Sequence, residues 1–394
     1  MNSKVGAPLF QLSRSPAESL LSASMDEELE AGFARQGFAT LDRFLRSLAR
    51  RRDVDYADLA TEPSRFKDAG GTDFTCTVTI RIKFRGVPLI RLSGYGYGTS
   101  ARDAKLIALA ESLERLGFCL RGWHDSTPPA TGRPLLETSA AADNTNGACF
   151  HSSPLKALKG AFCELLERDA FLVAWYSGHP LPVSRISRGH RLYSWQRRFA
   201  SEGWDLREHC WPHDRVPATF VGLSLTRRTP ARDQWNFFFG SGAAPRMAEA
   251  QDRALREMLK SRRYASGWTV GTSGRATSSQ LRSPESRRIL YQRPAFVRKF
   301  MARLAVRPRM AVGLRRELSD RAFVAQCFEE ITSAKVVPLL LPRPFRETAF
   351  CIQIVSDELQ MLDWQTPPNY NSGRIQALCR TPPRLLCRLH HPLS

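Results

Sequence analysis

Hydrophobic residues recur three or four positions apart along several segments of the chain, which is the spacing of an amphipathic α-helix. At about 100° per residue, the segment around residues 101–120 places its leucines on one side and its charged groups on the other. The leucines are Leu106, Leu109, Leu113, Leu116 and Leu120, and opposite them lie Ala104, Glu111, Glu114 and Arg115. We predict a helix here whose leucine face enters the core.

A second helix, starting near Ser153-Pro154, divides in the same way. Its apolar face comprises Leu155, Phe162, Leu166 and Val173, and its other face comprises Ala157, Gly160, Ala161, Glu164, Glu167 and Arg168. A third helix is predicted over 246–264 and carries Arg253 and Glu257. Ser100 and Ser153 fit the N-cap positions of the first two helices. The small residues beside Glu164 and Glu167 predict space for a ligand.

Apolar runs with strand character lie between and after these helices. Arg85-Gly86 separates two of them and predicts a hairpin. The predicted strands are 75–84, 87–92, 217–225, 235–240, 336–341 and 350–355. Hairpins mixed with helices predict an α+β fold, with antiparallel or mixed sheets packed against helices, rather than a doubly wound sheet. Residues 1–65 are predicted to be a helical N-terminal extension, and 66–394 a single catalytic domain.

The charged faces predict chemistry because two helices repeat one motif, Glu-x-x-Glu-Arg, at residues 111–115 and 164–168. A single match most often marks a solvated helix surface with ion pairs. Two matches and a third acidic helix favour a shared site, in which converging carboxylates need cations between them. Mg²⁺ prefers oxygen ligands, and arginine binds phosphoryl oxygens bidentately. The pattern therefore predicts a nucleoside triphosphate site.

The runs 94–100, 104–115 and 145–169 together resemble the YcaO family, whose members use ATP and Mg²⁺ to phosphorylate a peptide-backbone amide oxygen. The resemblance covers about residues 70–270 well and implies a YcaO-like fold. By position, it implies metal ligands at Glu111, Glu114, Glu164, Glu167 and Glu257. It implies nucleotide contacts at Gly96, Gly98, Lys105, Arg115, Cys149, Ser152, Arg168, Arg253 and Lys260. Arg168 and Arg253 are also expected to act in catalysis.

Several positions depart from the family pattern. Tyr97 replaces a lysine between two glycines, and Ile107 replaces a serine. Cys149 and Ser152 stand for a Ser/Asn pair, and Lys260 stands for a glutamine. Lys260 keeps a charge that can meet a phosphate. The glycine-rich run 94–98 is interpreted as a loop that lets backbone approach a ligand, although a structural turn is the more frequent reason for such glycines.

The C-terminus ends in Arg388-Leu-His-His-Pro-Leu-Ser394. Azoline-forming members of the family tend to finish in a proline-rich tail that enters the active site. By this resemblance His391, or His390 beside it, and the Ser394 carboxylate are candidates for proton transfer. A frayed tail is the alternative.

The formal charge of +20 and the arginine pairs spread along the chain indicate a basic surface. Nucleic-acid motifs do not accompany them, so an acidic peptide or protein partner is favoured over nucleic acid. The nine cysteines are dispersed and contain no C-x-x-C pair, which is typical of buried thiols rather than a zinc site. No apolar run reaches the ~18 residues of a membrane span. We expect a cytoplasmic protein without a secretory signal.

From the resemblance we expect cyclodehydration of Cys, Ser or Thr to azolines in a ribosomally made precursor peptide. Thioamide formation with a helper protein is the alternative reaction. A degenerate ATP-binding scaffold subunit is the alternative outside catalysis. The expected partners are the precursor peptide and a leader-peptide-binding protein that recruits it, with a dehydrogenase and homodimer formation left open.

Overall fold

The computed structural model describes residues 26–359, apart from gaps of which the longest are 125–145, 267–291 and 307–317. Its helices are α2 (Asp26–Ala49), α3 (Ala101–His124), α4 (Pro154–Tyr176), α5 (Tyr193–Ser201), α6 (Met247–Ser266), α8 (Pro294–Met301) and α9 (Asp320–Glu330). Its strands are β1 (Val54–Asp68), β2 (Gly71–Phe84), β3 (Ile90–Gly98), β4 (Ala148–His151), β5 (Leu181–Val183), β6 (Trp204–Pro212), β7 (Thr219–Arg227), β8 (Phe237–Ala244), β9 (Leu304–Val306), β10 (Lys335–Pro338) and β11 (Phe350–Val355).

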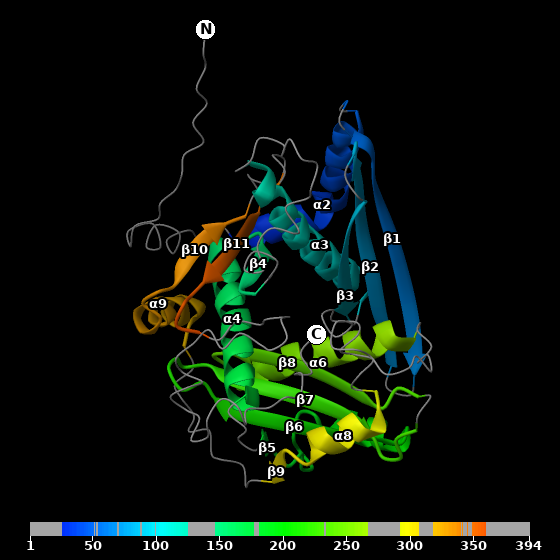
Figure 1. Cartoon of the computed structure of the whole chain (residues 1–394), viewed down its shortest axis with the longest axis vertical. Helices are drawn as coiled ribbons and strands as arrows, with labels where there is room; N and C mark the ends of the chain where they lie inside the picture. The colour runs from blue at the N-terminus through cyan, green and yellow to red at the C-terminus, as the bar shows by residue number, and fades with distance from the viewer. Residues whose placement is uncertain are drawn as a thin grey trace.

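Three antiparallel sheets and one short parallel pair organise these strands. The sheets have the orders β1-β2-β3, β10-β11-β4 and β6-β7-β8, and β5 pairs with β9 in parallel. Helices α2 and α3 pack on the first sheet, and α6 packs on β7 and β8 of the third (Figure 1). The architecture is α+β with mixed sheets, as the sequence predicted.

Helix α4 lies at the centre of the molecule and joins two of the sheets (Figure 1). It contacts β4 and β11 on one side and β7 and β8 on the other. Phe162, Leu166 and Phe171 are fully buried along it. The predicted apolar face is therefore correct but too narrow, because the opposite face is largely buried as well. Gly160 and Ala161 pack against protein there and do not open a cavity.

The predicted helix starts are confirmed. The Ser153 hydroxyl accepts a hydrogen bond from the Lys156 N–H (3.3 Å), and the Ser100 hydroxyl accepts one from the Asp103 N–H (3.0 Å). Each cap satisfies one of the N–H groups that a helix leaves unpaired in its first turn. Because these caps fix where α3 and α4 begin, they also fix which residues of each helix face the centre.

Residues 54–65 differ from the helical prediction. They belong to β1, which pairs antiparallel with β2 along its length. The polar sequence of β1, with Pro63 in its middle, suits an edge strand, where a missing N–H costs little. The guanidinium of Arg81 on β2 binds the Asp58 carboxylate across the pair, with Nε 2.8 Å from Oδ1. The predicted domain boundary at residue 65 thus falls inside a strand, and the domain division stays a prediction.

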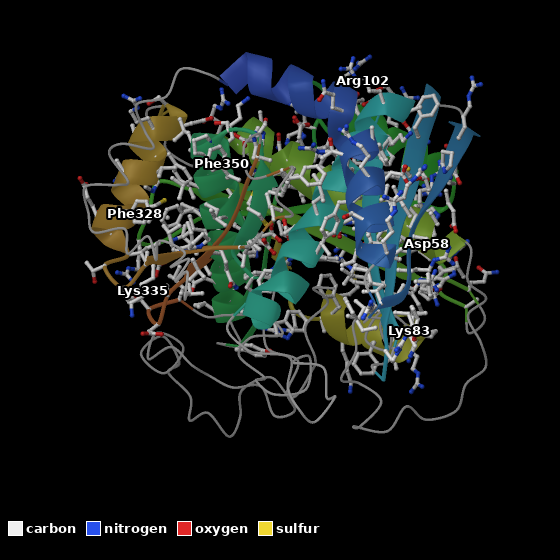
Figure 2. The ribbon with its side chains drawn as sticks, turned by 90° about the horizontal axis from the view of Figure 1, so that it is seen from above. Asp58, Lys83, Arg102, Phe328, Lys335 and Phe350 are labelled. Carbon is white, nitrogen blue, oxygen red and sulfur yellow. The ribbon has the colours of Figure 1, made fainter. Side chains whose placement is uncertain are left out.

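The hairpin formed by β1 and β2 lies at one side of the molecule and α9 at the other. Figure 2 shows Asp58 and Lys83 on the hairpin side, and Phe328 and Lys335 on the far side.

The hairpin predicted between 75–84 and 87–92 is confirmed as β2 and β3, and the strand 350–355 is confirmed as β11. Among the described helices, none has the length and apolar character that crossing a bilayer requires.

The glycine-rich run 94–98 is part of β3 rather than a loop. Helix α3 lies directly on this strand, and a Cβ on Gly96 would come within 1.7 Å of the Ala104 carbonyl oxygen. Glycine is therefore required at residue 96 by helix–strand packing. This close approach holds α3, with its two glutamates, against the first sheet.

Candidate functional site

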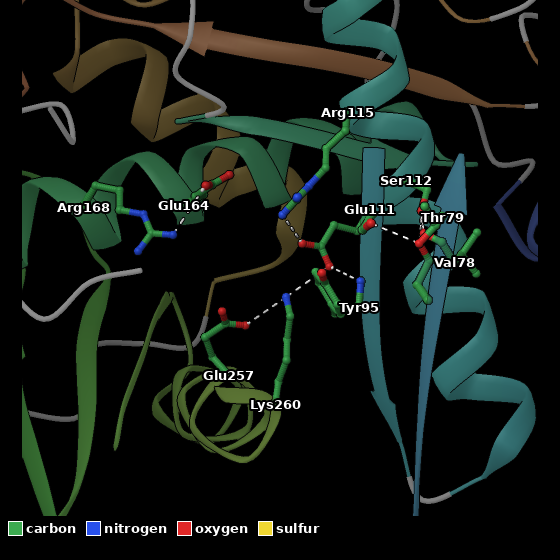
Figure 3. Close-up of polar contacts among 12 residues, drawn as sticks. Val78, Thr79, Tyr95, Glu111, Ser112, Arg115, Glu164, Arg168, Glu257 and Lys260 are labelled. Carbon is green, nitrogen blue, oxygen red and sulfur yellow. Dashed lines mark hydrogen bonds and ion pairs between the residues drawn. The ribbon is translucent and has the colours of Figure 1, made fainter. Parts of the chain in front are cut away.

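Carboxylates from three separate helices meet at the centre of the fold. Helix α3 supplies Glu111 and Glu114, α4 supplies Glu164 and Glu167, and α6 supplies Glu257. Lys260 of α6 reaches across to α3, with Nζ 3.0 Å from Glu111 Oε2 and 3.6 Å from Glu257 Oε2 (Figure 3). The two repeated motifs and the third helix therefore share one site, which we call the glutamate cluster: Glu111, Glu114, Glu164, Glu167 and Glu257.

The Glu111 carboxylate is held by three donors. Tyr95 N–H donates to Oε2 at 2.8 Å, Lys260 Nζ to the same oxygen at 3.0 Å, and Arg115 Nη2 to Oε1 at 2.7 Å. Burial opposes ionisation of Glu111, yet Lys260 and Arg115 hold its pKa below the usual value. Glu111 and Glu257 in turn raise the pKa of Lys260 against the effect of burial. Both groups therefore remain charged.

Glu114 and Glu164 are in the opposite situation. Burial, followed by the charges of Glu164 and Glu111, raises the pKa of Glu114 well above its usual value. Burial also raises the pKa of Glu164 to about 8, with Glu167 and Glu257 adding to the effect and Arg168 opposing it. These two carboxylates repel each other without enough positive charge between them. A cation placed there would relieve the repulsion.

Arg168 occupies the α4 side of the cluster. Its Nη1 lies 3.1 Å from Glu167 Oε1, and its Nη2 lies 3.7 Å from Glu164 Oε1. The same Glu167 oxygen accepts a hydrogen bond from the Ser241 hydroxyl of β8 at 2.6 Å. Arg168 Nε is buried and has no hydrogen-bond partner among the described residues. A buried N–H of this kind needs an acceptor.

Arg253 and Cys149 lie beside this group. Arg253 of α6 pairs with Glu249 one turn earlier (Nη2–Oε1, 3.3 Å) and experiences the charge of Glu167. Cys149 of β4 packs on Gly160 of α4, and burial together with the charge of Glu114 raises the pKa of its thiol. Cys149 is therefore a protonated packing group and not a thiolate nucleophile. Ser152 is buried between β4 and α4.

Other predicted residues are not brought into the cluster by a described contact. Lys105 lies on α3 with Nζ 4.2 Å from the ring centre of Phe38 on α2. Gly96 faces the Ala104 backbone of α3, and Gly98 faces Asp103 Cβ and the Ala104 N–H. His391 and Ser394 lie outside the described residues. Nucleotide or catalytic roles for these positions stay predictions.

Two contributors were missed from the sequence. The Tyr95 backbone N–H binds Glu111, and the Ser241 hydroxyl binds Glu167. A backbone donor carries no side-chain signal. Ser241 could have been noticed, because it lies in a run of small residues, Gly240-Ser-Gly-Ala-Ala244, that ends one strand directly before the third acidic helix.

The donors that are present fit a magnesium-bound triphosphate. The repelling carboxylates of Glu114 and Glu164 match the oxygen ligands that Mg²⁺ prefers. The unpaired Nε of Arg168 matches a phosphoryl oxygen. Solvent also reaches the cluster, since the side chains of Glu111, Glu164 and Lys260 remain 20%, 24% and 24% exposed. The cluster is therefore not sealed from solvent.

The raised pKa of Glu164 predicts how stability depends on pH. The unfolded chain loses this proton near the ordinary value of 4.5, whereas the folded chain keeps it until about 8. We therefore expect the metal-free protein to lose stability as the pH rises across that window. Mg²⁺ should reduce the loss by binding the ionised form. Thermal unfolding between pH 5 and 8.5, with and without Mg²⁺, measures both slopes; equal slopes would contradict cation binding at Glu164.

The fold is similar to that of several solved structures. One is described as YcaO from Methanopyrus kandleri bound with AMPPCP and Mg²⁺; it matches with a TM-score of 0.56 at 16% identity, covering 82% of this chain and 90% of that one. A heterocyclase in complex with substrate and cofactor gives 0.55 at 12% identity, covering 85% of this chain and 55% of that one. The E. coli microcin synthetase McbBCD complex gives 0.52 at 12% identity, covering 76% and 88%. No curated protein matches the chain.

These structures place the chain in the class of YcaO-type α+β folds. A family model described as YcaO cyclodehydratase, ATP- and Mg²⁺-binding, matches residues 122–318, which is half of the chain. The chain belongs to the YcaO family, and ATP and Mg²⁺ are its cofactors. The resemblance and the fold class predicted from the sequence are confirmed.

Proposed function

We propose that this chain activates backbone amides of a ribosomally made peptide by ATP-dependent phosphorylation of the amide oxygen, and converts Cys, Ser or Thr residues of that peptide to azolines. The observation that carries the proposal is the glutamate cluster, in which three helices surround the carboxylates of Glu114 and Glu164 with too few cations of their own. The family binds ATP and Mg²⁺, and we propose that the metal-bound phosphates lie at this cluster.

The acidic and basic residues of the site have different roles. Carboxylates of α3, α4 and α6 hold the magnesium. Arg168, held by Glu167 and Glu164, has a buried Nε without a partner among the described residues; it would donate to a phosphoryl oxygen and stabilise charge there. Arg253 adds positive charge from the neighbouring helix. Bound ATP supplies the phosphoryl group that turns the amide oxygen into a leaving group.

The remaining bonds are formed and broken within the peptide substrate. A Cys, Ser or Thr side chain adds to the preceding carbonyl carbon, and the former amide oxygen of this tetrahedral adduct takes the γ-phosphoryl group while ADP leaves. Loss of phosphate then leaves a C=N double bond in the five-membered ring. ATP becomes ADP and phosphate, and the peptide loses one water for each ring. We propose that a separate leader-binding protein recruits the peptide; the similarity in fold to a component of the McbBCD complex supports a partner protein.

Mass spectrometry tests the reaction directly. The chain, co-expressed with the peptides and proteins encoded beside it, should lower a peptide's mass by about 18 Da per ring, the mass of the water lost in ring formation. Glu167→Gln should abolish this shift, because it removes a carboxylate that holds Arg168. Glu329→Gln is a matched control, since Glu329 is exposed on α9.

Other mass shifts identify the alternatives. A gain of about 16 Da per site, dependent on sulfide, would indicate thioamide formation instead. If the chain binds ATP but neither changes the peptide nor hydrolyses ATP faster when the peptide is added, it is a scaffold subunit. Either result would overturn the proposed azoline chemistry.

A further inference from the structure

The glutamate cluster is electrostatically uneven. At Glu111, two cations and a backbone N–H already occupy both oxygens, with Arg115 on Oε1 and Lys260 and Tyr95 N–H on Oε2. At Glu164, the nearest described cation is Arg168 at 3.7 Å, and the same guanidinium lies closer to Glu167, at 3.1 Å. Protein cations therefore neutralise the α3 end of the cluster better than the α4 end.

Lys260 is placed as a divalent cation would be. Its ammonium lies between carboxylates of two different helices, 3.0 Å from Glu111 Oε2 and 3.6 Å from Glu257 Oε2 (Figure 3). An ammonium group is a compact point charge that, unlike a guanidinium, has no preferred plane. Mg²⁺ bridging the same two carboxylates would need its ligand oxygens at 2.0–2.1 Å. The ammonium and a metal ion cannot occupy that position together.

We propose that the Lys260 ammonium replaces one divalent cation of this site, so that Glu111 serves as a counter-ion for Lys260 and Arg115 and does not ligate metal. The metal ions then bind at the other carboxylates of the cluster, with Glu114 and Glu164 among them. This inference rests on the proposed function. It assigns Glu111 a different role from the metal ligand that the family resemblance implied. Lys260 has three N–H groups, so it can also donate to a phosphoryl oxygen.

Counting bound metal tests the inference without any turnover. Mn²⁺ has the same preference for carboxylate and water ligands as Mg²⁺ and is visible by electron paramagnetic resonance. The full chain is titrated with Mn²⁺ in the presence of AMPPCP. Lys260→Gln should bind one more Mn²⁺ per chain than the wild type. Lys260→Arg, which keeps the charge, should bind the wild-type number.

Two further variants separate charge from ligation. Arg256→Gln removes one positive charge from an exposed position of the same helix and should leave the count unchanged. Glu111→Gln in the wild-type background should also leave the count unchanged, because Glu111 is not a ligand. In the double variant Lys260→Gln/Glu111→Gln, the extra Mn²⁺ should be lost, since it needs the carboxylate released by the first change.

The outcomes are distinguishable. An equal count in the wild type and Lys260→Gln overturns the inference, and so does a count that falls in Glu111→Gln alone. The Mn²⁺ count of Glu111→Gln tests the inference even if Lys260→Gln does not fold. If the wild-type protein binds no Mn²⁺ in the presence of AMPPCP, the cluster is not a nucleotide site, and the proposed function fails as well.

Discussion

Replacing Glu164 by glutamine is expected to make the metal-free protein more stable while weakening its affinity for Mg²⁺–AMPPCP about a hundredfold. In the metal-free state the Glu164 carboxylate is partly buried beside other carboxylates, and its pKa is raised to about 8. Glutamine keeps the shape and removes the charge. At pH 8 or above the gain in the free energy of unfolding should be several kcal/mol at most, since the shift from 4.5 to about 8 spans about three and a half pKa units and one unit corresponds to about 1.4 kcal/mol.

The opposite signs of the two effects make the test specific. Replacing an ordinary structural glutamate by glutamine would lower the stability of the protein, because the ion pairs of that glutamate would be broken. Thermal unfolding with EDTA and calorimetric titration with Mg²⁺–AMPPCP measure the two quantities. Glu329→Gln on α9 should change neither. A Glu164→Gln protein that is less stable and binds the nucleotide normally would show that this residue holds the fold rather than the metal.

Substituting Gly96 by alanine is expected to cause the largest loss of stability of any change considered above, about 3 kcal/mol or more. The added Cβ would lie 1.7 Å from the Ala104 carbonyl oxygen and 2.7 Å from the Ala108 backbone nitrogen. Both are main-chain atoms of α3, so no side chain can move aside. The helix must lift from β3, which also displaces Glu111 from the Tyr95 N–H that binds it.

Gly86→Ala provides the comparison for this prediction. Gly86 has a φ of 74° but open space around its Cβ position, so alanine there should cost only the strain of a left-handed backbone, about 1 kcal/mol. Urea unfolding of both variants compares the two costs. Equal losses would mean that α3 does not lie as closely on β3 as described.

The sequence was sufficient wherever one periodic pattern decided the local structure. The leucines of α3, with Leu109, Leu113 and Leu116 fully buried, followed from helical spacing. The strand at 350–355 followed from an unbroken apolar run. The convergence of the glutamates was also predicted, because the same motif appeared twice at the spacing that puts its charges on one face of a helix.

The sequence was insufficient where neighbours distant in the chain decide the structure. The polar strand β1 forms because β2 pairs with it, and its own residues carry little β propensity. The glycine-rich run became a strand because α3 packs against it. Lys260 was interpreted as a phosphate contact, since no local pattern shows that a residue 149 positions away is its partner.

That separation along the chain has a consequence for how the protein assembles. Glu111 of α3 and Lys260 of α6 meet only after the segment with the first sheet and the segment with the third sheet have come together, whereas Glu114 of α3 and Glu164 of α4 repel each other beside them. The Glu111–Lys260 ion pair favours the association of these segments, and the repulsion between Glu114 and Glu164 opposes it. Magnesium supply in the cell should therefore influence how much of this polypeptide matures, before any substrate is encountered.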